Sequence, residues 1–455
     1  MPHRILRQQI SRPVLEICKE LRNAGERAWV VGGCVRDTLR GERVNDWDIA
    51  TTALPEKVKK TFPRVIPTGI DHGTVTVLWK GQGYELTTLR GEGLYTDGRR
   101  PDHVVFVGDI DQDLARRDFT VNAIAYDPVD GHLADPFGGL DDMRNKVLRA
   151  VGDPGERFSE DGLRILRGAR FVATLEFELE PETEAAFRGA LDTFRKVSPE
   201  RVREEWLKTM KARRPSRGFE VMRRTGILEV TYPELLEQVG CEQNKWHAYD
   251  VWGHTMRVLD ESEGGPIERV AALLHDVAKP RTRAFSDKTN DWTFYHHEKV
   301  GADMAEQWLR AYRFSNQERE LVTGLVRNHL ICYTPDWSDA AVRRFMKRVG
   351  RDQLDPLFRL GEADALGKGR DVEAELELLS ELRSRVEHQA EQGGALSASD
   401  LAIGGNDLVP MLDGGAGPAV GRILRALLDR VIEDPSLNTR DKLMPIAEEL
   451  AKAES

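Results

Sequence analysis

The chain has 455 residues, of which 40% are hydrophobic and 31% charged, and its formal net charge is −10. This length predicts two to four domains, and the composition is typical of a globular protein with a sizeable core. No apolar run approaches the length of a membrane-spanning helix, the N-terminus does not resemble a signal peptide, and the four cysteines form no CxxC pair. We therefore expect a cytoplasmic protein with reduced thiols and no membrane partner.

Strand-like and helical segments alternate over the first 150 residues or so. Short β-branched or apolar runs between turn residues predict strands, at 28–31, 73–79, 84–89, 104–107 and 123–126. Beyond about residue 156 the pattern becomes helical. The sequence therefore predicts the α+β class, with a sheet-containing head followed by a mostly α-helical remainder.

A glycine turn precedes two acidic residues in this head. Gly32 and Gly33 follow the first predicted strand, with Arg36 shortly after, and one residue separates Asp46 from Asp48. Residues i and i+2 of a strand share a face, so two carboxylates placed there favour a bound cation. Mg²⁺ binds one or two carboxylates together with substrate phosphates, and glycine backbone N–H groups can cradle a triphosphate. The combination predicts nucleotidyl transfer with both aspartates as catalytic Mg²⁺ ligands, whereas Asp-x-Asp alone is more typical of a solvated strand edge.

A second polar segment begins at Arg116. Arginine forks suit phosphate oxygens, so we expect Arg117, Asp118 and Asn122 to contact the nucleotide. A surface turn with a structural ion pair is the alternative. Glu85, on the strand predicted at 84–89, is a candidate third carboxylate.

Asp161 and Arg164 begin a helical stretch, and Arg167 and Arg170 follow at helical spacing. Positions i and i+3 share a helix face, which is typical of an ordinary ion pair. A carboxylate and a guanidinium held side by side can instead hydrogen-bond a base edge as a partner base would. Cytosine and adenine both present an amine donor and a ring-nitrogen acceptor, so one pair accepts both. We predict that these four residues bind the nucleotide.

The segment from 194 to 224 is basic, with eleven Lys or Arg against four Glu. Ser198 and Pro199 predict a helix start within it. Solvated amphipathic helices explain such a stretch, but after a phosphate-handling domain it predicts a path for a nucleic-acid backbone. We expect Trp206 in this segment to pack in the core. The residues expected to bind RNA are Arg201, Lys208, Lys211, Arg213 and Arg214.

Histidine and aspartate recur through the region from about 246 to 368, which is predicted to be helical. The residues are His254, His275, Asp276, His297, His329 and Asp364. Each taken alone is more often structural, but imidazole and carboxylate together suit Mg²⁺, Mn²⁺, Co²⁺ or Ni²⁺. His254, His275, Asp276 and Asp364 can hold one ion, and His297 and His329 can help to hold a second. An open coordination position would activate water against a phosphoester.

The last part of the chain shows no motif with chemistry. Glycine, alanine and serine dominate 393–417, which predicts a linker or loop, and helices are predicted at 420–433 and 439–452.

The ordered motifs resemble those of the class II CCA-adding enzymes and bacterial poly(A) polymerases. They are GGxVRD with DxD, RRD, EDxxR and the basic segment that begins at Ser198. The resemblance implies that Asp46 and Asp48 bind Mg²⁺, that Asp161 and Arg164 select CTP and ATP, and that the partner is the 3′ end of tRNA rather than DNA. The segment 91–101 occupies the place of the family's flexible loop, which enzymes adding only CC have shortened.

The histidine region resembles the HD phosphohydrolase superfamily, and some bacterial CCA-adding enzymes carry such a domain with phosphatase and 2′,3′-cyclic phosphodiesterase activities. The expected domains are a nucleotidyltransferase head at 1–150, a helical neck and body at 151–240, an HD domain at 241–370 and C-terminal helices at 371–455. The alternatives are an enzyme that adds only A, a poly(A) polymerase and a non-catalytic RNA-binding protein with inherited motifs. A further alternative makes the HD domain the main activity, as a nucleotide or cyclic-nucleotide phosphohydrolase.

Overall fold

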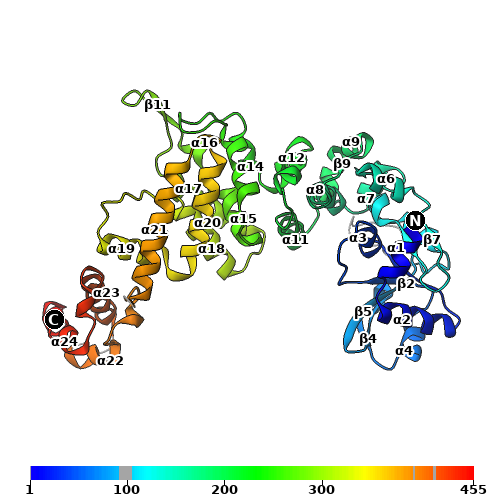
Figure 1. The fold of residues 1–455 in the computed structure, drawn as a ribbon, viewed down its shortest axis with the longest axis horizontal. Helices are drawn as coiled ribbons and strands as arrows, with labels where there is room; N and C mark the ends of the chain where they lie inside the picture. The colour runs from blue at the N-terminus through cyan, green and yellow to red at the C-terminus, as the bar shows by residue number, and fades with distance from the viewer. Residues whose placement is uncertain (1, 92–104, 393–394, 413–416, 455) are drawn as a thin grey trace. The chain divides into compact units, whose positions relative to one another are not determined.

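The computed structural model describes residues 2–91, 105–392, 395–412 and 417–454 (Figure 1). The chain divides into two compact units, Met1–Pro233 and Glu234–Ser455. The expected flexible loop at 91–101 lies outside the described residues, apart from its first residue. The domain boundaries at 150, 240 and 370 stay predictions.

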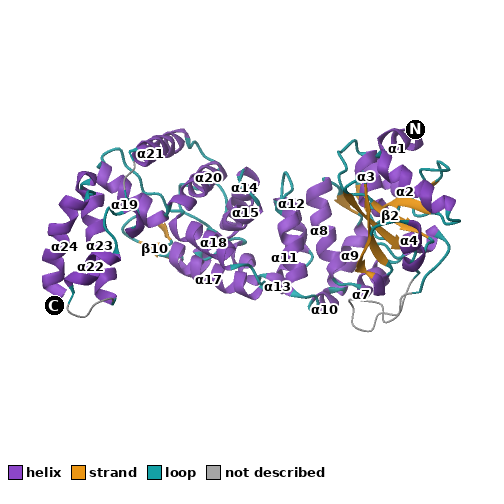
Figure 2. Cartoon of the chain, turned by 90° about the horizontal axis from the view of Figure 1, so that it is seen from below, coloured by secondary structure: helices purple, strands orange, loops and turns teal. Residues whose placement is uncertain are grey.

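A seven-stranded sheet lies in the first unit, in the order β3-β4-β5-β2-β1-β6-β7. Only the β2–β5 pair is parallel among the described strands of this sheet. Figure 2 shows these strands in orange among the helices of the N-terminal unit. Their bounds are β1 (Ala28–Val31), β2 (Asp48–Thr51), β3 (Val65–Gly69), β4 (Thr74–Trp79), β5 (Gln82–Thr88), β6 (Ala125–Tyr126) and β7 (Leu133–Ala134).

Alternate residues of β1 enter two apolar clusters on opposite faces of the sheet. Val30 packs in a cluster with Ile17, whereas Trp29 and Val31 pack in another with Leu114. The helices in this part of the chain are α1 (Pro2–Gln9), α2 (Arg12–Asn23), α3 (Gly33–Leu39), α4 (Pro55–Thr61), α5 (Ile110–Ala115) and α6 (Gly139–Asn145). The predicted α+β class is confirmed.

Two of the predicted strands differ from the structure. A 3-10 turn at Thr120–Asn122 precedes the strand predicted at 123–126, and only Ala125–Tyr126 pairs as a strand. At 104–107 the first residue is not described, and Phe106 makes an isolated bridge with Arg90.

A helical layer completes the first unit around α8 (Leu163–Leu175), which α11 (Pro199–Thr209) and α12 (Ser216–Arg224) contact. Ser198 precedes α11 as predicted, but its hydroxyl makes no capping hydrogen bond. Trp206 is fully buried against Phe219, which confirms its core role. The remaining elements are α7 (Pro154–Glu160), α9 (Pro181–Gly189), α10 (Leu191–Phe194), α13 (Ile227–Thr231), β8 (Val147–Leu148) and β9 (Glu178–Leu179).

The second unit is mostly helical, with one short hairpin of β10 (Ala284–Ser286) and β11 (Asp291–Thr293). Its first helices are α14 (Val251–Glu261), α15 (Pro266–Leu274), α16 (Lys279–Thr282), α17 (His297–Ala311) and α18 (Asn316–Asn328). The later ones are α19 (Asp339–Val349), α20 (Arg351–Gly367), α21 (Glu373–Glu391), α22 (Gly405–Leu408), α23 (Pro418–Glu433) and α24 (Arg440–Glu454). No helix in the described part of the chain is long and apolar enough to cross a membrane.

The linker or loop predicted at 393–417 is wrong in part, because its described residues include short helical turns, among them Gly405–Leu408, and several buried side chains. Leu401, Ile403 and Leu408 are buried in one apolar cluster with residues of α23 and α24. The composition of this segment is typical of a linker, but its spaced apolar side chains are buried in a shared hydrophobic core. Arg343 of α19 joins this region to the rest of the unit, because its guanidinium donates to the backbone carbonyls of Ile432 and Glu433.

Candidate functional site

A cavity of about 540 Å³ in the first unit collects most of the residues predicted to handle a nucleotide. Strands β1, β2 and β5 and helices α3 and α8 contribute to its lining. Positive charge prevails, because eight arginines line it against five acidic residues. They are Arg36, Arg90, Arg116, Arg117, Arg164, Arg167, Arg170 and Arg201, with Asp48, Glu85, Asp113, Asp118 and Asp161.

Two carboxylates lie side by side in this cavity, on neighbouring strands. Asp48 of β2 and Glu85 of β5 are direct partners in the parallel pair. Partial desolvation raises the pKa of Asp48, with Arg117 opposing and Asp46 adding to the shift. Desolvation also raises the pKa of Glu85, and then the charges of Asp48 and Asp46 do. Grouped carboxylates that resist ionisation fit a site for a divalent cation, because its charge would relieve their repulsion.

Asp46 differs from expectation in one respect, because β2 begins only at Asp48. Asp46 therefore lies in the loop before the strand. Exposure still alternates, since Asp46 and Asp48 are exposed while Trp47 between them is buried.

The glycine turn makes room for an arginine. Gly32 has a φ of +74°, and a Cβ built on it would lie 2.6 Å from Nη1 of Arg117. Asp113 is buried on α5 and lies 3.2 Å from Arg117 Nη2 and 2.5 Å from Arg116 Nη2. Only glycine permits this close approach in a left-handed conformation, so the turn and Asp113 together place two arginines at the cavity.

Asn122 and Asp118 form a second buried support. Arg36 Nη1 donates to Asn122 Oδ1 at 2.5 Å, and Asn122 Nδ2 donates to Asp118 Oδ1 at 3.0 Å. Arg167 Nε donates to Asp118 Oδ2 at 2.7 Å. These contacts hold Arg36 and Arg167, which come from α3 and α8, in one network.

The expected helix face shared by Asp161 and Arg164 is wrong. Asp161 has extended backbone between α7 and α8, with φ −144°, and a Cβ on the next residue, Gly162, would lie 2.4 Å from Phe194 N. The chain therefore breaks between the two helices at this close contact, and Asp161 accepts the N–H of Leu163 at 3.0 Å.

Each of these two side chains has a different partner from the one predicted. Arg164 Nη1 donates to Glu160 Oε2 at 2.5 Å, and its Nη2 donates to the carbonyl of Arg116 at 3.0 Å. Asp161 Oδ2 accepts from Arg201 Nη2 at 2.6 Å. Both residues line the cavity, so an acceptor and a donor still face it, each fixed by its own support.

Sequence reasoning missed several residues that support the cavity. Glu205 of α11 is buried and lies 2.6 Å from Arg170 Nε. The Arg170 guanidinium also lies over the ring of Phe171, 4.0 Å from its centroid. Asp113 could have been predicted from its arginines at i+3 and i+4. Glu205 has Lys208 at i+3, but its contact at the cavity is with Arg170, which is distant in sequence.

The residues predicted to bind RNA divide into two groups. Arg201 lines the nucleotide cavity and contacts Asp161. Lys208 pairs with Glu205 at 3.1 Å, and Lys211, Arg213 and Arg214 are exposed at the end of α11 and the turn before α12.

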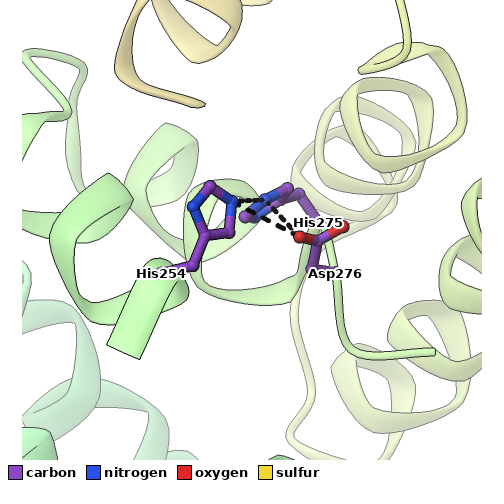
Figure 3. Close-up of side chains that lie close together, drawn as sticks. All are labelled: His254, His275 and Asp276. Carbon is purple, nitrogen blue, oxygen red and sulfur yellow. Dashed lines mark hydrogen bonds and ion pairs between the residues drawn. The ribbon is translucent and has the colours of Figure 1, made fainter. Parts of the chain in front are cut away.

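A second cluster of side chains lies in the C-terminal unit and unites all six predicted residues. His254 Nε2 lies 3.2 Å from His275 Nε2 and 3.4 Å from Asp276 Oδ2 (Figure 3). Asp364 Oδ1 lies 3.0 Å from His254 Nε2. On the other side of Asp276, Oδ1 lies 3.3 Å from His297 Nε2 and 3.7 Å from His329 Nε2.

The arrangement fits bound metal. His254, His275 and Asp276 form one group of potential ligands, and Asp276, His297 and His329 form another. The Nδ1 atoms of His275, His297 and His329 face backbone carbonyls at 2.6–2.7 Å, which leaves Nε2 as the ligand atom. Both oxygens of Asp276 are buried, and the Lys279 ammonium lies 2.7 Å from Oδ2. A carboxylate buried in this way is satisfied by a cation.

The pKa shifts in this cluster have opposite signs. Burial, and then the charge of His275, lowers the pKa of His329 to about 3, which keeps its imidazole neutral. Burial also opposes charge on His275, but the adjacent Asp276 outweighs it and raises the pKa. Neutral imidazole is the form that binds metal.

A cavity of about 290 Å³ lies beside this cluster, and three residues that were not predicted line it: His247, Lys279 and Lys368. The His247 ring lies 4.9 Å from the His254 ring. Lys279 Nζ lies 2.7 Å from Asp276 Oδ2, and Lys368 joins them in the lining. The i+3 spacing between Asp276 and Lys279 could have predicted this contact from the sequence.

Three families match successive parts of the chain. Residues 28–149 match the Poly A polymerase head domain, 176–238 match the Probable RNA and SrmB- binding site of polymerase A, and 247–366 match the HD domain. The HD match spans the six clustered residues.

The chain is similar to curated proteins over nearly its whole length. It is 33% identical to the CCA-adding enzyme of Lactiplantibacillus plantarum over 449 residues, which cover 98% of this chain and 97% of that one. It is 44% identical to the CCA-adding enzyme of Lactobacillus johnsonii over 250 residues, which cover 52% of this chain and only 63% of that relative.

Solved structures show the same fold. The CCA-adding enzyme of Bacillus stearothermophilus, in complex with CTP, superposes with a TM-score of 0.71 at 27% identity, over 98% of this chain and 99% of that one. The Thermotoga maritima enzyme, complexed with tRNA, has a TM-score of 0.57 at 20% identity over 99% and 98% of the two chains, and it supports the fold alone.

Proposed function

The chain belongs to the family of CCA-adding enzymes, and we propose that it adds or repairs the 3′-terminal CCA of tRNA from CTP and ATP without a nucleic-acid template. The observation that carries this proposal is the cavity in which Asp48 and Glu85 face a set of arginines. The CTP complex of the Bacillus stearothermophilus relative supports the choice of nucleotide.

The reaction joins the 3′-hydroxyl oxygen of the RNA to the α-phosphorus of the nucleotide, and pyrophosphate leaves. Asp46 and Asp48, with Glu85 beside them, would hold Mg²⁺. When bound, this ion would favour ionisation of the attacking hydroxyl and offset the charge on the leaving oxygens. Arg36 and Arg117 would hold the triphosphate, since arginine forks match phosphate oxygens.

Base selection would fall to the acceptor on Asp161 and the donors of Arg164. Arg201 supports this assignment by holding the Asp161 carboxylate, so we propose it as a nucleotide-site residue rather than a contact to the RNA backbone. Asp118 and Asn122 would act through Arg167 and Arg36, whose side chains they fix. Arg170 would also contact the nucleotide, with its side chain held by the ion pair with Glu205.

Lys208, Lys211, Arg213 and Arg214 would contact the tRNA backbone. They project from α11 and the turn that follows it, and the match of residues 176–238 to a polymerase RNA-binding family supports the placement.

The His254–Asp364 cluster supports a second function, metal-dependent hydrolysis of phosphoesters. Asp276 would bridge the two ligand groups, and Mg²⁺, Mn²⁺, Co²⁺ or Ni²⁺ would supply an activated water when bound. Phosphate monoesters and 2′,3′-cyclic phosphates are the proposed substrates.

The main alternative is an enzyme that adds only the terminal A, because it would need the same cavity. The deciding experiment incubates the protein with labelled tRNA ending in the discriminator base, in C or in CC, each with CTP, ATP or both. Extension of all three to CCA supports the proposal. Extension of the CC substrate alone supports the A-adding alternative, and absence of any extension contradicts both.

A further inference from the structure

One aromatic ring lies among the arginines of the nucleotide cavity. Phe171 of α8 is the only aromatic residue that lines this cavity within the part of the chain that the structure describes. It is 4% exposed, and its ring makes an edge-to-face contact with Phe119, with 5.8 Å between the centroids. Packing against Phe119 accounts for a buried apolar side chain at this position, but it does not account for the cations around the ring.

Three guanidinium groups gather around the Phe171 ring. The Cζ atom of Arg170 lies 4.0 Å from the ring centroid, that of Arg36 lies 5.3 Å away and that of Arg167 5.4 Å. All three distances fall within the range of about 6 Å over which the electron-rich face of a ring attracts a cation. Arg36 comes from α3, whereas the other two arginines precede Phe171 on α8. The ring is therefore a contact that cations from two helices share.

Like charges brought this close repel one another, and each of the three arginines has a carboxylate of its own. The pairs are Arg36–Asp37 at 2.8 Å, Arg167–Asp118 at 2.6 Å and Arg170–Glu205 at 2.6 Å. Desolvation lowers the pKa of Arg170, Glu205 opposes this shift, and the charge of Arg167 adds to it. The carboxylates belong to three different segments of the chain, whereas the ring is common to all three arginines.

We propose that Phe171 is a positioning residue for nucleotide binding, because its ring attracts the three arginines and sets where they meet the phosphates of the nucleotide. The inference rests on the nucleotidyl transfer proposed above, in which Arg36 holds the triphosphate. An aliphatic side chain of similar size would fill the same space without a negative face, and the three guanidinium groups would lose their common anchor. The ring acts through the arginines and not on the base, so its weakening affects all four nucleotides alike.

Fluorinated phenylalanines separate the charge of the ring from its shape. Analogues with one, two or three ring fluorines at position 171 draw electron density from the ring face and leave its packing nearly unchanged. The Kd of the full chain for CTP and for ATP, measured by calorimetry with Mg²⁺, should rise stepwise and reach about tenfold with three fluorines, as the loss of a desolvated cation–π contact predicts. The Kd for inorganic triphosphate, which has no base, should rise by a similar factor. A Kd that stays constant along the series overturns the inference.

Phe187 provides a matched control that packs against the same helix. It is fully buried, its ring makes an edge-to-face contact with Phe158 at 5.1 Å, and a Cβ built on Gly168 of α8 would lie 2.5 Å from its Cζ atom. Among the described residues no guanidinium lies over the Phe187 ring. The same fluorinated series at position 187 should therefore leave every Kd unchanged. Equal weakening in both series would show an effect of packing alone and overturn the inference.

Nucleotide addition gives a second readout. With labelled tRNA ending in CC, the series at position 171 should raise the KM for ATP and leave kcat close to that of the wild type. Discrimination of ATP against GTP should also stay that of the wild type, and relaxed discrimination or a lower kcat at unchanged KM contradicts the positioning role. If the wild type adds no nucleotide, the proposed function fails, and the Kd values for CTP and inorganic triphosphate decide the inference. A stepwise rise then supports it, and a constant Kd or an absence of binding overturns it.

Discussion

Asp118 and Arg167 form a buried ion pair, with Oδ2 2.7 Å from Nε and 2.6 Å from Nη2. Burial opposes the charged form of Asp118, but Arg167 and Asn122 outweigh it and hold the pKa of this carboxyl well below its ordinary value of 3.8. The pair thus joins residues 49 positions apart at the edge of the nucleotide cavity.

Asp118→Asn should lower the free energy of unfolding at pH 7 by about 3–5 kcal/mol, because it leaves Arg167 without a buried counter-charge. The folded-state pKa is depressed, so this stability is present above pH 3.8 and is lost as the pH falls toward the folded-state pKa. Urea unfolding at pH 7 and pH 2.5 should therefore show a gap between variant and wild type that shrinks in acid. Asp141→Asn, which breaks the exposed pair with Arg144, is the control and should cost less than about 1 kcal/mol. A gap independent of pH would contradict the ion pair.

Asp46→Ala and Asp48→Ala should each abolish nucleotide addition, while urea unfolding remains close to that of the wild type. Both residues are exposed and contribute charge rather than packing. Glu85→Gln should reduce addition by a smaller factor if it only assists the pair. Incorporation of labelled CTP and ATP measures the effect, and Glu56→Gln on α4 is the control for loss of an exposed carboxylate. Substantial incorporation by either Asp variant would remove the metal assignment.

Asp161→Ala and Arg164→Ala should slow addition of CTP and ATP and relax discrimination against UTP and GTP. Each lost hydrogen bond to the base edge should cost roughly 1–3 kcal/mol. Arg201→Ala should show a weaker form of the Asp161 effect, because it frees the carboxylate without removing it. The kcat/KM values for the four nucleotides provide the measurement. Equal slowing of all four would point to structural ion pairs alone.

Affinity for tRNA should fall as salt rises, despite the acidic net charge. Each phosphate contact by Lys or Arg contributes to the slope of log affinity against log salt. Arg213→Glu with Arg214→Glu should flatten that slope, whereas Arg12→Glu with Arg144→Glu, the same charge change on exposed head residues, should change it less. Filter binding at several salt concentrations tests this. A slope unaltered by the first pair would exclude these arginines from the RNA path.

His275→Ala with Asp276→Ala should remove bound metal and hydrolysis of phosphoesters while largely sparing CCA addition. Asp276 faces both ligand groups, so its loss should lower the metal content at both. Elemental analysis after dialysis against Ni²⁺ or Mn²⁺ measures this independently of activity, and Asp303→Ala on α17 is the exposed control. Loss of CCA addition as well would indicate misfolding or coupling between the units. A wild type that retains no metal would make the cluster structural.

Local patterns predicted the parts of the fold and site that depend on neighbours in sequence. The apolar run of β1 and the glycine turn after it place Arg36 at the cavity as expected. The helix face of Asp161 and Arg164 failed, because the close contact between Gly162 and Phe194 is tertiary and leaves no local pattern. The role of Glu205 was not predicted for the same reason, because the sequence alone does not distinguish a buried glutamate from an exposed one.

The histidine cluster was readable because four imidazoles and two aspartates are too many to coincide by chance on predicted helices. Their division into two groups that share Asp276 required the folded chain. At 393–417 the small residues predict a linker. The burial of Leu401, Ile403 and Leu408 in an apolar cluster instead packs this segment against the terminal helices.

Arg343 connects the terminal helices to the rest of the C-terminal unit. Its guanidinium is nearly inaccessible to water, and two of its three acceptors are the carbonyls at the end of α23, with Gln389 as the third. A protein shortened before α23 would lose these two acceptors, and it would uncover both the Arg343 guanidinium and the apolar side chains that pack against α23 and α24. In descendants of this sequence, loss of the C-terminal helices and replacement of Arg343 should therefore occur together.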